Sequence, residues 1–265
     1  MSALPTVFIS HGSPMHALEA GAVADAWRRL AAELPKPKAL LVASAHWETH
    51  APALTGASRP ETIHDFYGFP RPLYEIRYPA PGAPEVAGRA QALLRETGYE
   101  TDIDPERGLD HGAWSPLLYM YPEADVPVVQ LSLQTPLGGA HHVALGRALA
   151  PLADEGVLIV GSGQMTHNLR ERQDGPALPY VSEFQAWMRE RLLAGDGEAV
   201  AGYRSRAPHA RRAHPSEEHF LPLCVAVGAA GEGARADCLY DAVETGVLAM
   251  DLWRFHRAPG GAARG

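Results

Sequence analysis

Short apolar runs alternate along the chain with segments whose apolar residues repeat at helical spacing. Four of the runs are uninterrupted, which is typical of strands covered on both faces of a parallel sheet. They occupy residues 6–10, 39–45, 126–133 and 157–160. The alternation of such strands with helices predicts an α/β fold, in which a mostly parallel central sheet is flanked by helices.

The segments between these runs carry apolar residues three and four positions apart. This spacing predicts helices at residues 23–34, 86–97, 145–152 and 180–191. We predict a fifth helix capped by Ser216, with Glu217 and Glu218 in its first turn, where negative charge favours the positive end of a helix. A last apolar stretch, at residues 247–255, predicts one more strand.

The length of 265 residues fits one α/β domain. Residues 51–84 are rich in proline and aromatic residues and show no periodicity, so we expect a long ordered loop of the kind that builds a lid or a binding wall. Residues 258–265 are a Gly/Ala-rich tail that we expect to be disordered. Because the sequence shows no internal repeat and no linker, we predict a single domain over residues 1–257.

Composition excludes several classes of protein. The formal net charge is −8 and no stripe of lysine and arginine is present, which argues against nucleic-acid binding. Two cysteines, Cys224 and Cys238, are too few for a disulfide framework or a cysteine-rich zinc site. The sequence has no run near the roughly 20 apolar residues of a membrane span and no signal-peptide pattern. We therefore expect a soluble, cytoplasmic protein with no nucleic-acid or membrane partner.

Histidine is the most informative residue type, with thirteen in the chain. His11 directly follows the run 6–10, His46 directly follows the run 39–45, and His167 lies in a Gly-containing segment just past the run 157–160. Open parallel sheets bind ligands outside the carboxyl ends of their strands. These side chains are therefore expected to converge at one edge of the sheet.

Two more histidines lie at comparable positions. His111 is flanked by Gly112 in a segment that we expect to be a loop, and His219 lies at the start of the predicted fifth helix. Imidazole binds both zinc and iron, and three neutral ligands with open positions are typical of a catalytic metal site. Each histidine alone is more typical of a turn or a half-buried polar group. Together they indicate a metal site at the carboxyl ends of the strands.

The other histidines are expected to have structural or surface roles. His141 and His142 would form a solvated helix end, and His64 has a context that suits the wall of a site. Those expected at the surface are His16, His50, His209, His214 and His256. The sequence contains no nucleophile elbow, no phosphate-binding Gly-Lys loop and no dinucleotide fingerprint, so we expect no bound organic cofactor.

Several of these histidines lie in distinctive sequence blocks. In chain order the blocks read FISHGSPM (8–15), SAHW (44–47), IHDFYGFP (63–70), YPAPG (78–82), LDHGAW (109–114), THNLR (166–170) and EHFLPL (218–223). Together they resemble the class III extradiol ring-cleavage dioxygenases, and most closely the 4,5-DOPA extradiol dioxygenase branch. The resemblance implies a single catalytic α/β domain with a mononuclear non-haem Fe(II) site, which cleaves a catechol beside its paired hydroxyl groups with O₂.

The resemblance also assigns roles to individual residues. His11, His46 and His219 match metal ligands. His167 matches a histidine beside the metal that acts as acid and base, and that can itself bind the metal when no substrate is present. His111 matches a histidine near the substrate hydroxyl groups. The wider superfamily usually has Glu as its third ligand, whereas this branch has His219 there, beside two glutamates.

The expected partners are a catechol such as DOPA, cleaved at its 4,5 bond, and O₂. We expect Fe(II) for activity and Zn(II) in purified protein, because zinc lies above iron in the Irving–Williams order. Two alternatives remain open on the same residues: a zinc-dependent hydrolase, since three histidines and a water also form a hydrolytic site, and a non-catalytic metal-binding relative. The sequence predicts no particular oligomeric state.

Overall fold

The computed structural model describes residues 3–257, and these form an eight-stranded sheet in the order β4-β3-β5-β2-β6-β1-β10-β7. Its strands are β1 (Thr6–Ser10), β2 (Ala39–Glu48), β3 (Ala53–Thr55), β4 (Asp102–Asp104), β5 (Val128–Leu133), β6 (Val157–Gly163), β7 (Arg235–Tyr240) and β10 (Leu252–His256). A small hairpin pairs β8 (Val243–Glu244) with β9 (Leu248–Ala249).

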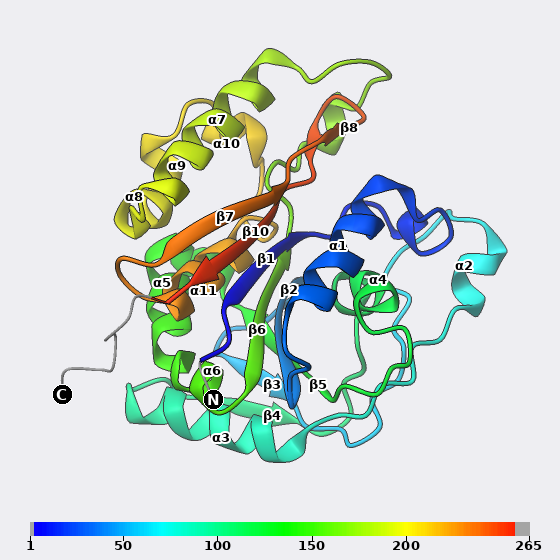
Figure 1. Ribbon diagram of the computed structural model, residues 1–265, viewed down its shortest axis with the longest axis vertical. Helices are drawn as coiled ribbons and strands as arrows, with labels where there is room; N and C mark the ends of the chain where they lie inside the picture. The colour runs from blue at the N-terminus through cyan, green and yellow to red at the C-terminus, as the bar shows by residue number, and fades with distance from the viewer. Residues whose placement is uncertain (1–2, 258–265) are drawn as a thin grey trace.

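The centre of the sheet is parallel, as the uninterrupted apolar runs predicted. Strand β6 pairs in parallel with both β1 and β2, and β2 pairs in parallel with β5. Strands β3 and β4 are parallel to each other. Three pairs are antiparallel: β3 with β5, β1 with β10, and β10 with β7. Strands β1, β2 and β6 therefore end at the same edge of the sheet, side by side (Figure 1).

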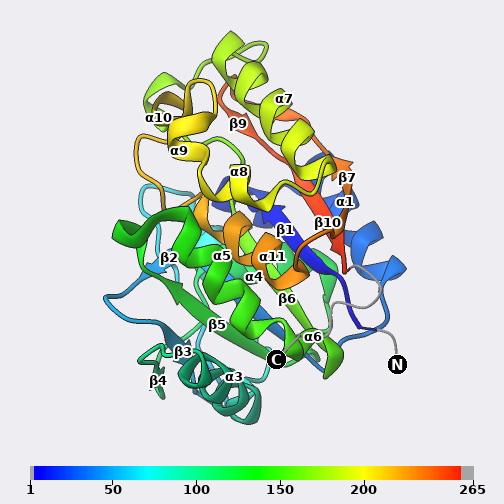
Figure 2. The same ribbon diagram turned by 90° about the vertical axis from the view of Figure 1, so that its left-hand side faces the viewer.

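Helices cover both faces of the sheet. The α-helices are α1 (Gly21–Glu33), α2 (Arg71–Glu75), α3 (Pro84–Glu96), α4 (His111–Met120), α5 (Gly138–Leu149), α6 (Pro151–Asp154), α7 (Pro179–Leu193), α8 (Gly197–Ala201), α9 (Tyr203–Arg206), α10 (Ala210–Ala213) and α11 (Leu221–Ala230). Short 3-10 helices occupy Pro14–Ala17, Thr135–Leu137 and Leu169–Glu171. Helices α5 and α11 lie on one face, with α1 and α4 on the other (Figures 1 and 2).

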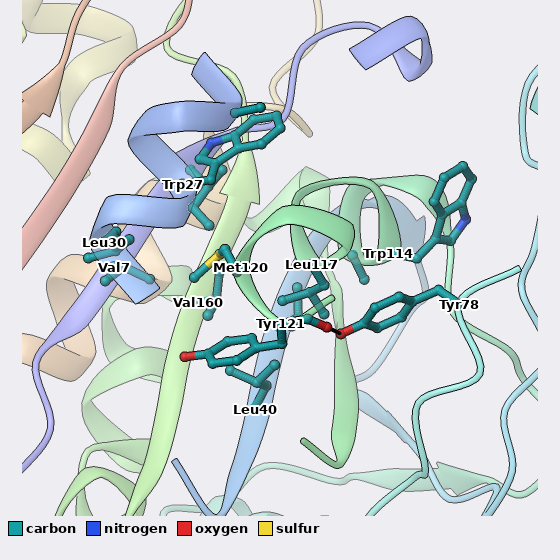
Figure 3. Packing of buried hydrophobic residues seen from close by; sticks show 14 of the residues in the cluster. Val7, Trp27, Leu30, Leu40, Tyr78, Trp114, Leu117, Met120, Tyr121 and Val160 are labelled. Carbon is teal, nitrogen blue, oxygen red and sulfur yellow. Dashed lines mark hydrogen bonds between the residues drawn. The ribbon is translucent and has the colours of Figure 1, made fainter. Parts of the chain in front are cut away.

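The alternation of side chains along each strand supplies a core to both faces. In β1, Val7 joins the core under α1 and α4, whereas Phe8 joins the core under α7 and α11. Trp27 of α1 is fully buried on the first of these faces (Figure 3). Tyr78, from the segment 51–84, is buried there as well, and its hydroxyl donates to the carbonyl of Tyr121 at 3.0 Å. The long segment is thereby tied to the end of α4.

The four predicted strands are confirmed as β1, β2, β5 and β6, and the helical spacings correspond to α1, α3, α5 with α6, and α7. The predicted start of the fifth helix is wrong. Helix α11 begins at Leu221 with Pro222 in its first turn, a position that suits proline because the first N–H groups of a helix are unpaired. Ser216 donates instead to the Glu218 carboxylate at 3.0 Å.

Three other expectations need correction. Residues 247–255 form two strands, β9 and β10, rather than one. The segment 51–84 is ordered but contains β3 and α2. His111 lies in no loop: it is the first residue of α4, and the carboxylate of Asp110 accepts the N–H of Ala113 as the helix cap. The tail expected to be disordered lies outside the described residues. Among residues 3–257, no helix is both long and apolar enough to span a membrane.

Candidate metal centre

Parallel strand ends bring the predicted histidines together. His11 directly follows β1, His46 lies near the end of β2, and His167 follows β6 by a few residues. His111 opens α4, which lies on one face of the sheet, and His219 lies in the turn directly before α11, the helix on the other face. The site is therefore built where the sheet edge and the beginnings of two helices meet.

The imidazole rings form one compact cluster. The ring centre of His46 lies 4.9 Å from that of His11, 4.0 Å from that of His111 and 5.0 Å from that of His219. Nε2 of His46 faces Nε2 of His11 at 3.0 Å. The ring of His167 stacks on that of His219, with centres 3.5 Å apart and planes 11° apart. All five histidines singled out in the sequence thus lie in a single cluster.

Two sets of metal-binding side chains can be distinguished within this cluster. The ligand atoms of His11, His46 and His111 lie within 4.8 Å of one another. Those of His167, Glu218 and His219 form a second such set. The sequence grouped His219 with His11 and His46 as ligands. The structure places His219 beside both, and it also brings His111 as close to them as a ligand would be.

The rings of His11, His46 and His219 each have Nδ1 close to a side-chain oxygen. Nδ1 of His11 lies 3.0 Å from the Ser162 hydroxyl, and Nδ1 of His219 lies 2.9 Å from the Glu218 carboxylate. Nδ1 of His46 lies 3.3 Å from Oδ2 of Asp65. In metal sites the second nitrogen of a ligating histidine is held in this way, which fixes the tautomer and the direction of the ring. The arrangement leaves Nε2 of each ring for a metal ion.

Burial keeps these rings uncharged. It lowers the pKa of His11 and of His219 well below the usual value, with a further contribution from the neighbouring histidines. Burial, together with the neighbouring His111, lowers the pKa of His46 to about 3, and burial lowers that of His167 to about 4. A neutral imidazole is the form that binds a metal. The close approach of Nε2 atoms and the neutral, pre-oriented rings fit a divalent cation.

The glycine that ends β6 allows the two halves of the site to approach. A Cβ on Gly163 would lie 2.1 Å from the carbonyl oxygen of His219, far inside normal contact. That same oxygen accepts the N–H of Gln164 at 2.8 Å. The backbone that carries His219 is therefore fixed directly against the end of the strand, which only glycine permits at this distance.

Sequence reasoning missed the carboxylates and hydroxyls that hold the rings. Asp65 and Glu218 lie in two of the sequence blocks quoted above, but Asp65 was given no role and Glu218 was expected only to favour the start of a helix. Ser162 lies in the Gly-Ser-Gly end of β6, where alternation along the strand points its side chain to the same face as the His11 ring. An acidic residue next to a histidine in an aperiodic segment, as in His64-Asp65, was the available signal.

Several of the other histidines are more buried than expected. His142 and His214 are fully buried, not at the surface, because their rings bond backbone groups: His142 accepts from the N–H of Gln134, and Nε2 of His214 lies 2.8 Å from the Met165 carbonyl. His16 is also largely buried and pairs with Glu244. His50 and His209 are exposed as expected, whereas His141 and His256 are half-buried.

His64, expected in the wall of a site, is held outside the cluster. Its Nε2 lies 3.0 Å from the carbonyl oxygen of Ile76, and its ring packs edge-on to Phe66. The Phe66 ring in turn lies 5.6 Å from that of His111. The segment 51–84 thus supplies an aromatic neighbour to the histidine cluster, and His64 supports that neighbour.

A separate cavity of about 610 Å³ lies between α5, α11 and the segment that joins α7 to α8. Its walls include Val143, Arg147, Arg191 and Val227, and none of the described histidines lines it. The charged groups there pair with one another, for example Arg147 with Glu232. The cavity is therefore separate from the histidine cluster.

Comparison with known proteins gives the family of the chain. Residues 5–247 match the family described as the catalytic LigB subunit of aromatic ring-opening dioxygenase. The chain is 47% identical over 258 residues to a protein of Beta vulgaris named 4,5-DOPA dioxygenase extradiol, covering 94% of this chain and 96% of that one. A protein of the same name from Escherichia coli K12 is 37% identical over 253 residues, covering 93% of each chain.

A solved structure shows the same fold. The crystal structure of an uncharacterized Escherichia coli K12 protein superposes with a TM-score of 0.80 at 33% sequence identity, covering 95% of this chain and 99% of that one. The chain belongs to the LigB family of aromatic ring-opening dioxygenases, the class III extradiol enzymes that its sequence blocks resembled. It is an extradiol ring-cleaving dioxygenase with a metal cofactor, and its reaction requires a catecholic substrate and O₂.

Proposed function

We propose that this enzyme opens the ring of a catechol such as DOPA by 4,5-cleavage, at a mononuclear Fe(II) centre. The observation that carries the proposal is the meeting of the Nε2 atoms of His11 and His46 at 3.0 Å, with the ring of His219 beside them, at the ends of parallel strands. Support for DOPA comes from the names of the plant and bacterial relatives. The single domain that carries the activity spans residues 1–257 in this proposal.

In this proposal His11, His46 and His219 are the metal ligands, each through Nε2. His167 lies beside them as the acid and base, and binds the metal when no substrate is present. The stacking of His167 on His219 supports this, because it keeps the two rings on the same side of the centre. His111, whose ring lies 4.0 Å from that of His46, is next to the position of the substrate hydroxyl groups.

The metal ion, when bound, supplies the charge that lowers the pKa values of the catechol hydroxyl groups and the redox link between the ring and O₂. The protein supplies the proton acceptors. His167 is neutral at pH 7, so a ring nitrogen accepts a hydroxyl proton and later returns it. His111 donates its Nδ1–H to Asp65, so its Nε2 is free to accept a hydrogen bond from a substrate hydroxyl group. After Nε2 has taken up a proton, it can donate a hydrogen bond to an oxygen that gains negative charge.

Fe(II) is the proposed metal for activity, and Zn(II) the metal expected in protein purified in air. Zinc stands above iron in the Irving–Williams order, and a site of neutral imidazoles offers no selection against it. Zinc has no accessible redox chemistry, so the zinc form would bind a catechol without oxidising it. A cytoplasmic location is also proposed, because Cys224 and Cys238 are both unpaired.

The test is reconstitution of metal-free protein with Fe(II) in the absence of air, followed by an oxygen-electrode screen of catechols that includes DOPA. We expect oxygen uptake and a ring-opened product that absorbs at longer wavelength with the iron form, and almost none with the zinc form. The hydrolase alternative replaces this proposal if the zinc form hydrolyses an ester or amide while the iron form leaves every catechol unchanged.

A further inference from the structure

Asp65 connects two histidines of the cluster from a segment outside the sheet. Its Oδ2 lies 2.9 Å from Nδ1 of His111 and 3.3 Å from Nδ1 of His46. Its Oδ1 accepts the backbone N–H of His111 at 2.9 Å. A single carboxylate therefore contacts one proposed metal ligand, one proposed proton acceptor and the first N–H of α4.

These contacts favour one tautomer of both rings. An ionised carboxylate only accepts hydrogen bonds, so Nδ1 of His111 carries the proton of that bond. Nδ1 of His46 lies 3.3 Å from the same carboxylate, and this contact favours a proton on that atom as well. The Asp65 carboxylate faces three nitrogen groups, the backbone N–H of His111 and the Nδ1 atoms of His111 and His46, and these surroundings favour its ionised form. With Nδ1 protonated, the lone pair of each neutral ring is on Nε2, where a metal or a substrate hydroxyl is bound.

We propose that Asp65 is a positioning residue that fixes His46 as a metal ligand and, at the same time, His111 as a proton acceptor. The inference rests on the roles proposed above for these two histidines. It makes metal affinity and turnover depend on one side chain that touches neither metal nor substrate. Removing the carboxylate frees both rings to rotate and lets either nitrogen carry the proton.

Helix α4 keeps its own cap when Asp65 is replaced. Helix α4 already has a cap, since the carboxylate of Asp110 accepts the N–H of Ala113. Asp110 is held separately by the Ser44 hydroxyl at 2.6 Å and the Gln130 amide at 2.7 Å. His46 is held in the sheet by the backbone of β2. The loss of Asp65 is therefore expected to leave the elements in place and to affect the rings alone.

The first experiment measures metal affinity without turnover. Zn(II) and Co(II) are titrated against a competing chelator in the wild type and in Asp65→Asn, Asp65→Ala and Asp65→Glu. Loss of an outer hydrogen-bond partner of a ligating histidine typically weakens metal binding by about 10–100-fold. We expect that loss in the Asn and Ala variants, a changed visible spectrum of their Co(II) forms, and partial recovery in Asp65→Glu, which restores the carboxylate.

Asp196→Asn is the matched control. The carboxylate of Asp196 likewise accepts a backbone N–H at the start of a helix, that of Ala199 at 2.9 Å, but it lies away from the histidine cluster. This variant should bind metal as the wild type does. The proposal is overturned if Asp65→Asn binds metal as tightly as the wild type and Asp196→Asn do. It is also overturned if Asp65→Asn binds metal more weakly only because the metal-free protein is less stable, as a lower thermal midpoint would show.

The second experiment separates the two histidines. At saturating Fe(II), Asp65→Asn should lower kcat in the wild type, but should lower it no further in a His111→Phe background, because the ring through which it acts is gone. Its effect on metal affinity should persist in that background, since it acts through His46. Independent, multiplicative losses of kcat would contradict the coupling to His111. If the wild-type iron form opens no catechol, the proposed function fails, whereas the Zn(II) titrations still decide the role of Asp65.

Discussion

Gly163→Ala tests whether the end of β6 sets the position of His219. The added Cβ would lie 2.1 Å from the His219 carbonyl oxygen, and real Cβ atoms essentially never approach another heavy atom within 3.0 Å. The backbone of His219 must therefore move away by about 0.9 Å, the difference between these distances. Because the oxygen is also bonded to the N–H of Gln164, the clash cannot be relieved by rotating a side chain.

The expected cost has two parts. Adding a methylene-sized group to a closely packed contact destabilises a protein by about 1–3 kcal/mol. A displacement of about 1 Å in a catalytic group lowers a rate by roughly 10²-fold. We therefore expect Gly163→Ala to unfold at lower denaturant concentration, to bind Zn(II) more weakly, and to lose about 10²-fold in kcat/KM with Fe(II).

A matched variant distinguishes local displacement from general destabilisation. In Gly146→Ala the new Cβ would lie 2.1 Å from the Val225 carbonyl oxygen, a clash of the same size between α5 and α11 but away from the histidines. It should lower stability by a similar amount and leave metal affinity close to that of the wild type. The reasoning is refuted if both variants lose metal affinity to the same extent, or if Gly163→Ala keeps full affinity.

Two further predictions concern the histidine cluster, and a third concerns the buried His214 outside it. His11→Ala and His46→Ala should each lose bound metal and activity while the circular dichroism spectrum is kept, and elemental analysis checks this; a fully metallated His46→Ala would remove that residue from the site. His167→Phe should keep much of the metal yet lose roughly 10²–10⁴-fold in turnover, whereas metal loss equal to that of His11→Ala would make it a full ligand. Burial lowers the pKa of His214 to about 3, so its ring is neutral in the folded protein. In the unfolded chain the ring takes up a proton below about pH 6.5, so its contribution to stability falls as the pH drops through that value. Between pH 7.5 and 5.5, urea unfolding should show that the free energy of unfolding of the metal-free wild type falls by about 1.4 kcal/mol more than that of His214→Gln.

The arrangement of the sheet could be predicted because its signals are local. The apolar runs of β1, β2, β5 and β6 have no polar alternation, and burial on both faces is the only environment that suits them. The edge strand β4 carries three residues with two aspartates, a composition that favours a turn, and only its pairing with β3 makes it a strand. Tertiary pairing of this kind leaves no pattern in a short segment.

The histidines of the site could be predicted from position, because strand ends in a parallel sheet share an edge. Their partners could not, since Asp65 comes from a segment without periodicity and reaches His46 only when that segment is packed over α4. The burial of His214 was missed for a related reason. It lies among charged residues in the sequence, yet its ring packs against Phe184 of α7 and Phe220 of the turn before α11.

Two carboxylates place negative charge beside the proposed histidine ligands. In the proposed ligand set no negative charge touches the metal, but Glu218 contacts His219 and Asp65 contacts His46, each through Nδ1. Hydrogen bonding to a carboxylate makes an imidazole a stronger donor to a metal, so part of the negative charge acts through the ring. Because that charge lies one ring away, neither carboxylate would need to bind the metal itself in this proposal, and a bound metal could still hold a catechol and O₂. On this argument Asp65 and Glu218 belong to the metal centre as fully as the histidines do.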